Sequence, residues 1–418
     1  MGNKEKTMEN GHGKARMGFL DADRYALVFL VVVLHAACAY SHIIPWWHAS
    51  DPAQGHFYDG AIIALDLFLM PVLFFIAGYF ALPSLARRTG AGFALAKLRR
   101  FGIPLAVLVV FYLPMMIYLG YLMRVENPVA FWPFWLRLVG TIGDLRVLVL
   151  DTMEKMTPLL FDVSQHYLWF ISLLLIFFLV LALLRPLFRL DREGRGRGAE
   201  ASGGRMLLAL LVAWIVMGAA GGLCLAWMSD FTWIRWSGLV LFQPTRMPVY
   251  VGFFVLGMFA WKRGWFKERT LPGPAWLWLL LFLGLEALVL EAAFRSSPPM
   301  GAYPLGPAMG IGFVRTLAAL AGLGVCLTLP FGRFAKNQGF HGAMTAASYD
   351  VYLLHMPIVC LIPWLLTGVA LPVFLKFVIA ILGTMAASLA VSKWLMQPRP
   401  WAALALLMAV FGAVCVFG

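Results

Sequence analysis

The chain alternates long apolar stretches with short segments that carry most of its charge. A helix that crosses a bilayer needs ~17–25 apolar residues. Stretches of about this length lie near 25–44, 62–82, 102–122, 166–187, 206–228, 247–262, 275–294, 311–331, 347–368, 371–396 and 401–417. The last follows Gln397-Pro-Arg-Pro400 and fits either a span or an interfacial hairpin. The pattern predicts an all-α polytopic transmembrane bundle of 10–11 helices.

The same pattern divides the chain into three parts. Residues 1–19 are expected to form a cytoplasmic tail, residues 20–396 the transmembrane domain, and residues 397–418 a C-terminal apolar segment that is a candidate for the eleventh helix. The basic N-terminus precedes about 20 apolar residues, which is longer than the core of a signal peptide, so cleavage is not expected.

Composition and charge agree with a membrane protein. Of the 418 residues, 62% are hydrophobic and 13% are charged, about half the charge of a typical soluble domain. A net charge of +13 would also suit a nucleic-acid binder, but 24 of the 33 Lys and Arg residues fall in alternate connecting segments. The positive-inside rule assigns those segments to the cytoplasm, together with the N-terminus. No nucleic-acid partner is expected.

The charge tally also predicts the side of each long loop. Segments 83–101 and 185–205 are expected to be cytoplasmic, and segments 45–60 and 121–165 exoplasmic. The second exoplasmic segment contains an aromatic run, 131–140, that is typical of an element lying at the membrane interface. Residues 192–205 are rich in Gly and Arg and predict a flexible linker. All five cysteines lie in apolar segments without metal spacing and are expected to be buried and unpaired.

Arg24 and His35 are the first candidate site residues. They are eleven positions apart in the first apolar run, so they share one helix face and lie ~16 Å apart along the axis. Ionisable residues at membrane depth are costly and often functional. A histidine can act as a general base near neutral pH, and an arginine can bind phosphate or carboxylate in a bidentate manner. Equally, Arg24 can be a positive-inside anchor and His35 a packing residue.

Further candidates lie on the second and third spans. Asp66 can orient a histidine or pair with an arginine, either for function or as a structural ion pair. Pro71 and Gly78 on the same span predict a kink and a close helix contact. Lys97, Arg99 and Arg100 precede the third span, where clustered cations suit a phosphate-bearing ligand or simply follow the positive-inside rule.

Later segments add polar residues within apolar surroundings. His166 opens the fourth span, and Ser348 and His355 lie two turns apart on one face of the ninth, with Tyr352 between them. A histidine such as His355 is either a satisfied packing residue or part of a site. Elsewhere, Glu286 and Glu291 are expected to pair with Arg315 inside the membrane.

Several motifs together carry a family resemblance. They are Arg24-x10-His35, Met70-Pro-Val-Leu-Phe-Phe-Ile-Ala-Gly-Tyr79, Lys97-Leu-Arg-Arg100 with Ile103-Pro104, Tyr167-Leu-Trp-Phe170 and Ser348-Tyr-Asp-Val-Tyr-Leu-Leu-His355-Met-Pro357. In order and spacing, over roughly 20–396, the chain resembles the acyltransferase 3 family of multi-pass membrane proteins. The chain lacks His-x4-Asp, a Walker loop, His-Glu-x-x-His and Gly-x-Ser-x-Gly.

The resemblance implies a function and a site. It implies transfer of an acyl group, acetyl or succinyl in class, from cytoplasmic acyl-CoA to a hydroxyl of a sugar, glycan or lipid-linked acceptor, as in polysaccharide O-acetylation at a bacterial inner membrane. The family's catalytic histidine and arginine map onto His35 and Arg24, and its basic Arg-x-x-Arg maps onto Lys97 and Arg100. Lysine at the first of these positions keeps the charge but loses the bidentate geometry. Arg99 joins the expected donor-binding group. No bound cofactor or metal is implied.

The form of the second span, with Met70 before Pro71 and no fused soluble domain, also resembles the branch that includes periplasmic glucan succinyltransferases. Two other classes of function stay open. The chain can be a transporter or flippase with Arg24, Asp66 and His35 along a polar path, or a membrane scaffold without catalytic activity.

Overall fold

The protein is a bundle of long helices in the computed structural model, which describes residues 2–143, 147–150, 165–188, 202–236, 240–266, 271–295, 301–329 and 338–417. The helices are α1 (Gly2–Cys38), α2 (His56–Ala86), α3 (Gly90–Lys97), α4 (Ile103–Val107), α5 (Leu113–Leu122), α6 (Phe131–Gly140), α8 (Trp169–Leu183), α9 (Gly203–Trp227), α10 (Met247–Lys262), α11 (Ala275–Arg295), α12 (Leu305–Thr328), α13 (Gln338–Leu366), α14 (Val373–Val391) and α15 (Pro400–Phe417). Short π-helical turns join several of them, η1 (Leu98–Gly102), η2 (Leu108–Tyr112) and η9 (Ser392–Met396). The single 3-10 turns are η3 (Thr141–Gly143), η5 (His166–Leu168), η6 (Arg185–Leu187) and η7 (Pro244–Arg246).

The helical fold class predicted from the apolar pattern is confirmed. Within the described residues, eight helices are long and apolar enough to cross a membrane. They are His56–Ala86, Gly90–Leu122, His166–Leu183, Gly203–Trp227, Ala275–Arg295, Leu305–Thr328, Gly342–Leu366 and Val373–Met396. The other three predicted spans are also helical, in α1, α10 and α15, but they are shorter or more charged.

The first predicted span, 25–44, extends too far. The helix α1 ends at Cys38, and residues 39–44 form a turn instead. The turn is stabilised because Ser41 and the backbone N–H groups of His42 and Ile43 donate to the carboxylate of Asp59 on α2. Polar groups at the end of the apolar run therefore find partners outside the helix.

Close approach of backbones holds the middle of the bundle together. Helix α2 packs along α10, and a Cβ atom on Gly78 would overlap the backbone carbonyl of Phe254. The reciprocal position, Gly257, faces the backbone of Phe75 in the same way. The predicted close helix contact at Gly78 is confirmed, and it follows the small-residue packing of membrane helices.

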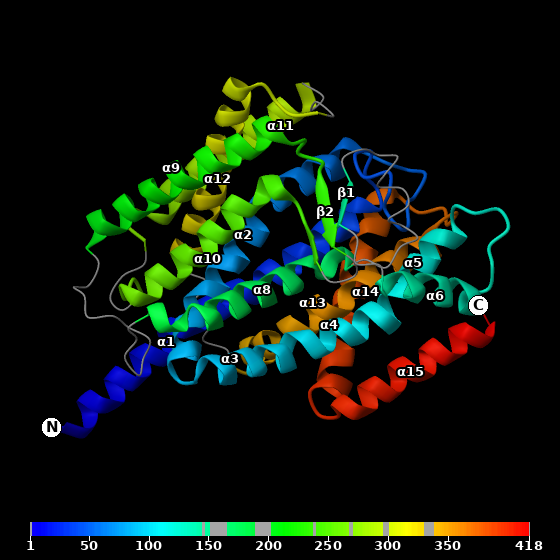
Figure 1. Ribbon diagram of the computed structural model, residues 1–418, viewed down its shortest axis with the longest axis horizontal. Coiled ribbons are helices and arrows are strands. Elements are labelled where there is room, and N and C mark those ends of the chain that lie inside the picture. Colours follow the sequence, from blue (N-terminus) through cyan, green and yellow to red (C-terminus); the bar gives the residue numbers. More distant parts are fainter. Residues whose placement is uncertain are drawn as a thin grey trace.

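The remaining helices are arranged on both sides of this pair (Figure 1). Helices α9, α11 and α12 lie on one side, with α12 packed on α9, α11 and α2. On the other side α1 packs against α13, and α13 packs against α14 and α5. The terminal α15 contacts α6 and the π turns η2 and η9 at the outer edge.

A small antiparallel sheet, which the all-α prediction did not include, lies at one end of the bundle (Figure 1). Its strands are β1 (Val147–Leu150), β2 (Trp233–Trp236) and β3 (Val240–Phe242), in the order β1-β2-β3. The pairing joins segment 121–165 to the loop before α10, with Val147 opposite Trp236. The two segments therefore lie at the same end of the bundle. The predicted linker 192–205 lies largely outside the described residues.

Candidate active site

Helices α1 and α13 run parallel and bring the two candidate motifs together. Near the start of the contact, Nε of Arg24 donates to Oγ of Ser348 at 3.1 Å, and its Nη2 donates to the carbonyl of Thr345 at 3.2 Å. The guanidinium also pairs with Asp21 at 3.2 Å, one turn earlier on α1. Arg24 is thus held in a defined orientation on both helices.

Farther along the same two helices, His35 meets His355. Nδ1 of His35 lies 2.9 Å from Nε2 of His355, and the rings stack with centroids 5.1 Å apart and a 16° angle between planes. The ring of Trp47, from the loop after α1, stacks on His35 at 5.6 Å and 20°. His355 is fully buried, whereas His35 is partly accessible. The two histidines predicted separately from the sequence therefore form one pair.

A proline explains how His355 and its surroundings are held. Pro357 lies inside α13 and has no N–H to donate to the carbonyl of Leu353 four residues earlier. The hydroxyl of Tyr167 donates to that carbonyl instead. The hydroxyl of Tyr112 likewise donates to the carbonyl of Leu354 at 2.7 Å. Side chains from two other helical segments thus satisfy the carbonyls that the proline disturbs.

Tyr352 adds a third hydroxyl contact, because it donates to the carbonyl of Tyr167 at 2.7 Å. Tyr167 and Tyr352 therefore join the start of the fourth span to α13 in both directions. The backbone carbonyl of Tyr352 also contacts the ring of His355, so these tyrosine contacts connect to the histidine pair.

The hydrogen bonds assign the protons of the histidine pair. Nδ1 of His355 faces the carbonyls of Tyr352 at 2.7 Å and Val351 at 3.2 Å. Carbonyl oxygens only accept, so Nδ1 of His355 carries a proton, and Nε2 of the neutral ring is an acceptor. Nδ1 of His35 must then be the donor in the 2.9 Å contact. In the neutral pair, Nε2 of His35 keeps a lone pair, and no hydrogen bond to the described residues engages it.

The predicted donor-binding cations are only partly brought together. Arg99 and Arg100 are exposed on the π turn η1, and Arg100 lies close enough to Arg24 for the two guanidinium groups to repel each other. The backbone carbonyl of Arg100 accepts from the hydroxyl of Tyr349 at 2.9 Å. Lys97 instead lies over the ring of Phe178, at 3.9 Å from its centroid. Its charge is engaged in a cation–π contact.

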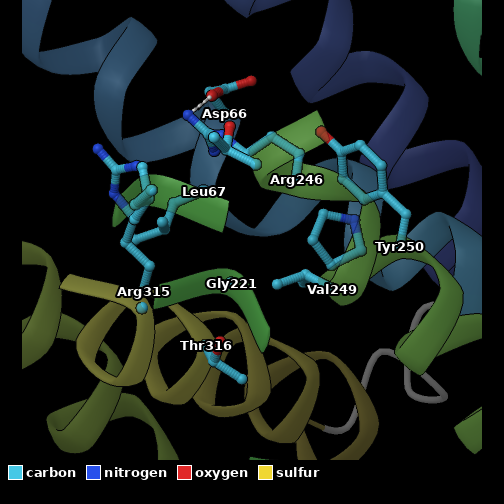
Figure 2. A pocket seen from close by; sticks show the side chains of 12 residues that line it. Asp66, Leu67, Gly221, Arg246, Val249, Tyr250, Arg315 and Thr316 are labelled. Atoms are coloured by element: carbon cyan, nitrogen blue, oxygen red, sulfur yellow. Dashed lines mark ion pairs between the residues drawn. The ribbon is translucent and has the colours of Figure 1, made fainter. Parts of the chain in front are cut away.

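Asp66 lies in a different polar pocket, between α2, α9, α10 and α12 (Figure 2). It pairs with Arg246 at 3.0 Å, so the expected arginine partner of Asp66 exists. The expected pairing of Glu286 and Glu291 with Arg315 is wrong. Arg315 pairs with Asp230 at 2.6 Å. The reason is topological, because the loop after α9 places Asp230 beside α12.

The two glutamates have other surroundings. Glu291 pairs with Arg295 one turn later on the same helix, at 2.8 Å. Glu286 is buried, and its carboxyl oxygens make no hydrogen bond within the described part of the chain.

Asp230 ties the pocket together. Burial acts to raise the pKa of Asp230, but Arg315 and Arg246, together with hydrogen bonds from Arg315 and Thr245, outweigh it and bring the pKa to about 2. The carboxylate is therefore charged at neutral pH and lies between Arg246 and Arg315. Each arginine is paired with an acidic group. The pocket contains neither Arg24 nor His35 among its lining residues.

His166 lies beyond Trp47, at the sheet end of the bundle. Its ring contacts that of His48 at 5.0 Å, and His48 is next to Trp47 in sequence and in space. Burial, with the nearby His166 and Arg124, holds the pKa of His48 well below its usual range. Arg124 donates to the carbonyls of Trp47, His48 and Gly120 and so fixes this loop. The rings of His48 and Trp47 thus lie between the predicted supporting residue His166 and His35.

The family model described as an acyltransferase domain matches residues 17–393. No curated protein and no solved structure matched the chain.

Proposed function

The chain belongs to this family of multi-pass membrane acyltransferases, and from that premise we propose that it transfers an acyl group from cytoplasmic acyl-CoA to a hydroxyl of a sugar, glycan or lipid-linked acceptor. The acyl group is of the acetyl or succinyl class. The histidine pair is the observation that supports this proposal most. Its hydrogen bonds leave the lone pair of Nε2 of His35 free to accept a proton.

His35 is the proposed general base. Nε2 accepts the proton of the acceptor hydroxyl while the hydroxyl oxygen attacks the thioester carbonyl, and a C–O bond forms as the C–S bond breaks. The proton then passes from Nε2 to the departing CoA sulfur, so the products are an ester and free CoA. His355 acts as a positioning residue, because its Nε2 accepts from Nδ1 of His35 and stabilises the charge that develops on that ring.

Arg24 and Arg100 are proposed to bind the donor. Two guanidinium groups that lie near each other and near the predicted cytoplasmic end suit the phosphates of CoA. Arg24 and His35 lie ~16 Å apart along α1, which matches the arrangement of CoA, where the phosphates and the thioester are at opposite ends of a long arm. Lys97 contributes charge from its cation–π position, and Arg99 is exposed beside it.

The acceptor is proposed to approach from the opposite end, where Trp47 covers His35. Aromatic rings of this kind provide flat apolar surfaces against which a sugar ring can pack, and they also keep water from the thioester. The transport alternative gains no support from Asp66, since this residue pairs with Arg246 in a pocket that does not include Arg24 or His35.

The test is an acyl-transfer assay with purified protein. Wild-type protein is expected to release free thiol from acetyl-CoA or succinyl-CoA in the presence of a glycan acceptor, and the His35→Ala variant to be slower by roughly 10²–10⁴-fold. His12→Ala, on the N-terminal segment of α1, serves as a matched control and should keep wild-type turnover. Near-normal turnover of His35→Ala would show that His35 has a packing role. Acceptor movement across the membrane without thiol release would favour transport.

A further inference from the structure

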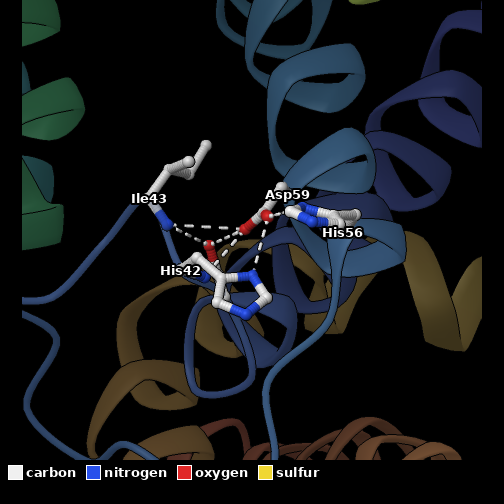
Figure 3. Close-up of polar contacts among 5 residues, drawn as sticks. His42, Ile43, His56 and Asp59 are labelled. Atoms are coloured by element: carbon white, nitrogen blue, oxygen red, sulfur yellow. Dashed lines mark hydrogen bonds and ion pairs between the residues drawn. The ribbon is translucent and has the colours of Figure 1, made fainter. Parts of the chain in front are cut away.

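A second polar cluster lies at the far end of α1 from Arg24, outside the proposed active site (Figure 3). Nδ1 of His42 lies 3.0 Å and Nδ1 of His56 lies 3.1 Å from the same oxygen, Oδ2 of Asp59. One nitrogen from each histidine and one oxygen of Asp59 all lie within 4.8 Å of one another. Three donor atoms of the kinds that bind transition metals therefore converge on one point.

The second oxygen of Asp59 is fixed by its own contacts. Oδ1 accepts from Oγ of Ser41 at 2.6 Å and from the backbone N–H of His42 at 2.8 Å. Asp59 is 1% exposed, whereas the side chains of His42 and His56 are 44% and 81% exposed. Hydrogen bonds from Ser41 and His42 thus hold the carboxylate in one orientation, as the hydrogen-bond partners of a metal ligand commonly do. The imidazoles face solvent, from which an ion can enter.

The spacing of the donor atoms fits a small divalent ion. With bonds of about 2.0–2.1 Å, the ligand atoms of a tetrahedral zinc site lie roughly 3.3 Å from one another. The separations of 3.0 and 3.1 Å to Oδ2 need only a small outward movement of the two exposed rings. We propose that His42, His56 and Asp59 bind a divalent transition-metal ion of the Zn²⁺ class, with water in the fourth position.

On binding, each neutral ring coordinates the ion through the lone pair of Nδ1 and keeps its one proton on Nε2, so the two contacts with Oδ2 of Asp59 are replaced by bonds to the ion. The ion would join the turn after α1 to the first turn of α2, because His42 comes from the former and His56 and Asp59 from the latter. The loop between those helices carries Trp47, which stacks on His35. The proposed ion therefore stabilises the loop that covers the proposed base, without a role in the chemistry.

The experiment uses full-length protein in detergent, purified with a tag that contains no histidine and treated with a chelator. Calorimetric titration with Zn²⁺ should show one ion per chain, and the melting temperature should rise with Zn²⁺. His56→Ala removes a ligand that is largely exposed, so the fold is not at risk. This variant and His42→Ala should lose the titration and the shift in melting temperature. Ser41→Ala, which removes only the hydroxyl behind Asp59, should weaken binding about 10–100-fold.

Glu291→Gln is the matched control, since it removes an exposed carboxylate elsewhere and should leave Zn²⁺ binding unchanged. Co²⁺ added to wild-type protein should give the visible absorption of a tetrahedral site, and this absorption should be absent from His56→Ala. A wild-type protein that takes up no Zn²⁺ at millimolar concentration would overturn the proposal. So would equal binding by wild type and the His42→Ala, His56→Ala double variant, because the ion would then lie elsewhere.

Discussion

Nδ1 of His35 and Nε2 of His355 are 2.9 Å apart, although the two residues are 320 positions apart in the chain. The contact couples the first helix to α13 and defines which nitrogen of His35 is unprotonated. In the proposed mechanism His35 exchanges protons with the substrates, whereas His355 holds the ring of His35 in one tautomer. The two histidines should therefore differ in the consequences of their replacement.

Replacing His355 is predicted to reduce turnover less than replacing His35. His355→Leu removes the acceptor for Nδ1 of His35 and leaves that partly buried donor without its partner, at a cost of about 1–3 kcal/mol. The turnover number should fall roughly 5- to 150-fold, with the KM for acyl-CoA nearly unchanged. The pH profile of turnover should also shift, because the neighbour of the base is altered. Steady-state kinetics across pH measure both effects.

His355→Gln is the companion variant, since its amide can still accept from His35. It should recover part of the lost turnover. If both variants match wild type in turnover and pH profile, His355 is a packing residue only.

Arg24→Lys and Arg100→Ala are predicted to weaken use of the donor more than use of the acceptor. Loss of one charge-assisted contact costs about 1.5–3 kcal/mol, so the KM for acyl-CoA should rise roughly 10- to 150-fold. Arg24 makes its hydrogen bonds through Nε and Nη2, a geometry that lysine cannot reproduce. Kinetics with each substrate varied in turn separate the two effects. An unchanged KM for acyl-CoA together with a changed KM for the acceptor would show that these arginines bind the acceptor and not the donor.

The ion pair of Asp230 is predicted to matter for stability. Asp230→Asn leaves Arg315 without its 2.6 Å counter-charge in a largely buried position, which should lower the free energy of unfolding by about 3–5 kcal/mol. Glu291→Gln breaks an exposed pair on one helix and should cost less than about 1 kcal/mol. Thermal unfolding in detergent compares the two. Equal stability of Asp230→Asn and wild type would mean that Arg315 finds another partner.

The pH dependence of this contribution follows from its sign. The pKa of Asp230 is lowered from its ordinary value of 3.8 to about 2 in the folded chain. The unfolded chain therefore binds the proton more readily between these values, and stability falls as the pH drops through that range. Above about pH 5, where the carboxyl is ionised in both states, the contribution should be constant. The Asp230→Asn variant should lack this acid-dependent loss.

The sequence predicted the helices well because a membrane span needs a continuous apolar run. All eleven predicted spans contain helix, and Gly78 makes the predicted close contact. The sheet could not be predicted from apolar runs, since its strands are short and lie in loops whose pairing depends on the distant chain segments they meet. The π turns at Arg99–Arg100 and Tyr112 have no signature in periodicity either.

The site could be predicted only in part, because some of its contacts join residues that are far apart in the chain. Helical spacing placed Arg24 and His35 on one face, but no local rule says that α13 packs parallel to α1 and brings His355 to His35. The freed carbonyl of Leu353 follows from Pro357 by a simple rule, whereas the identity of its donor does not. Arg315 received the wrong partner because ion pairs within a bundle depend on which loops fold back over it.

The orientation of the bundle is the last prediction, and it rests on both charge and structure. At one end Arg185 donates to the backbone carbonyl of Arg88, which brings the two strongly basic segments 83–101 and 185–205 together. At the other end β1 pairs with β2, which joins two segments of low charge. The positive-inside rule then predicts that the basic end faces the cytoplasm.

Arg195→Cys should resist an impermeant maleimide in intact cells and react after permeabilisation. Asn127→Cys, in an exposed loop at the opposite end, should react in intact cells and serves as the control. Labelling of position 195 in intact cells would show that the orientation is the reverse of the predicted one and that the proposed donor site does not face the cytoplasm.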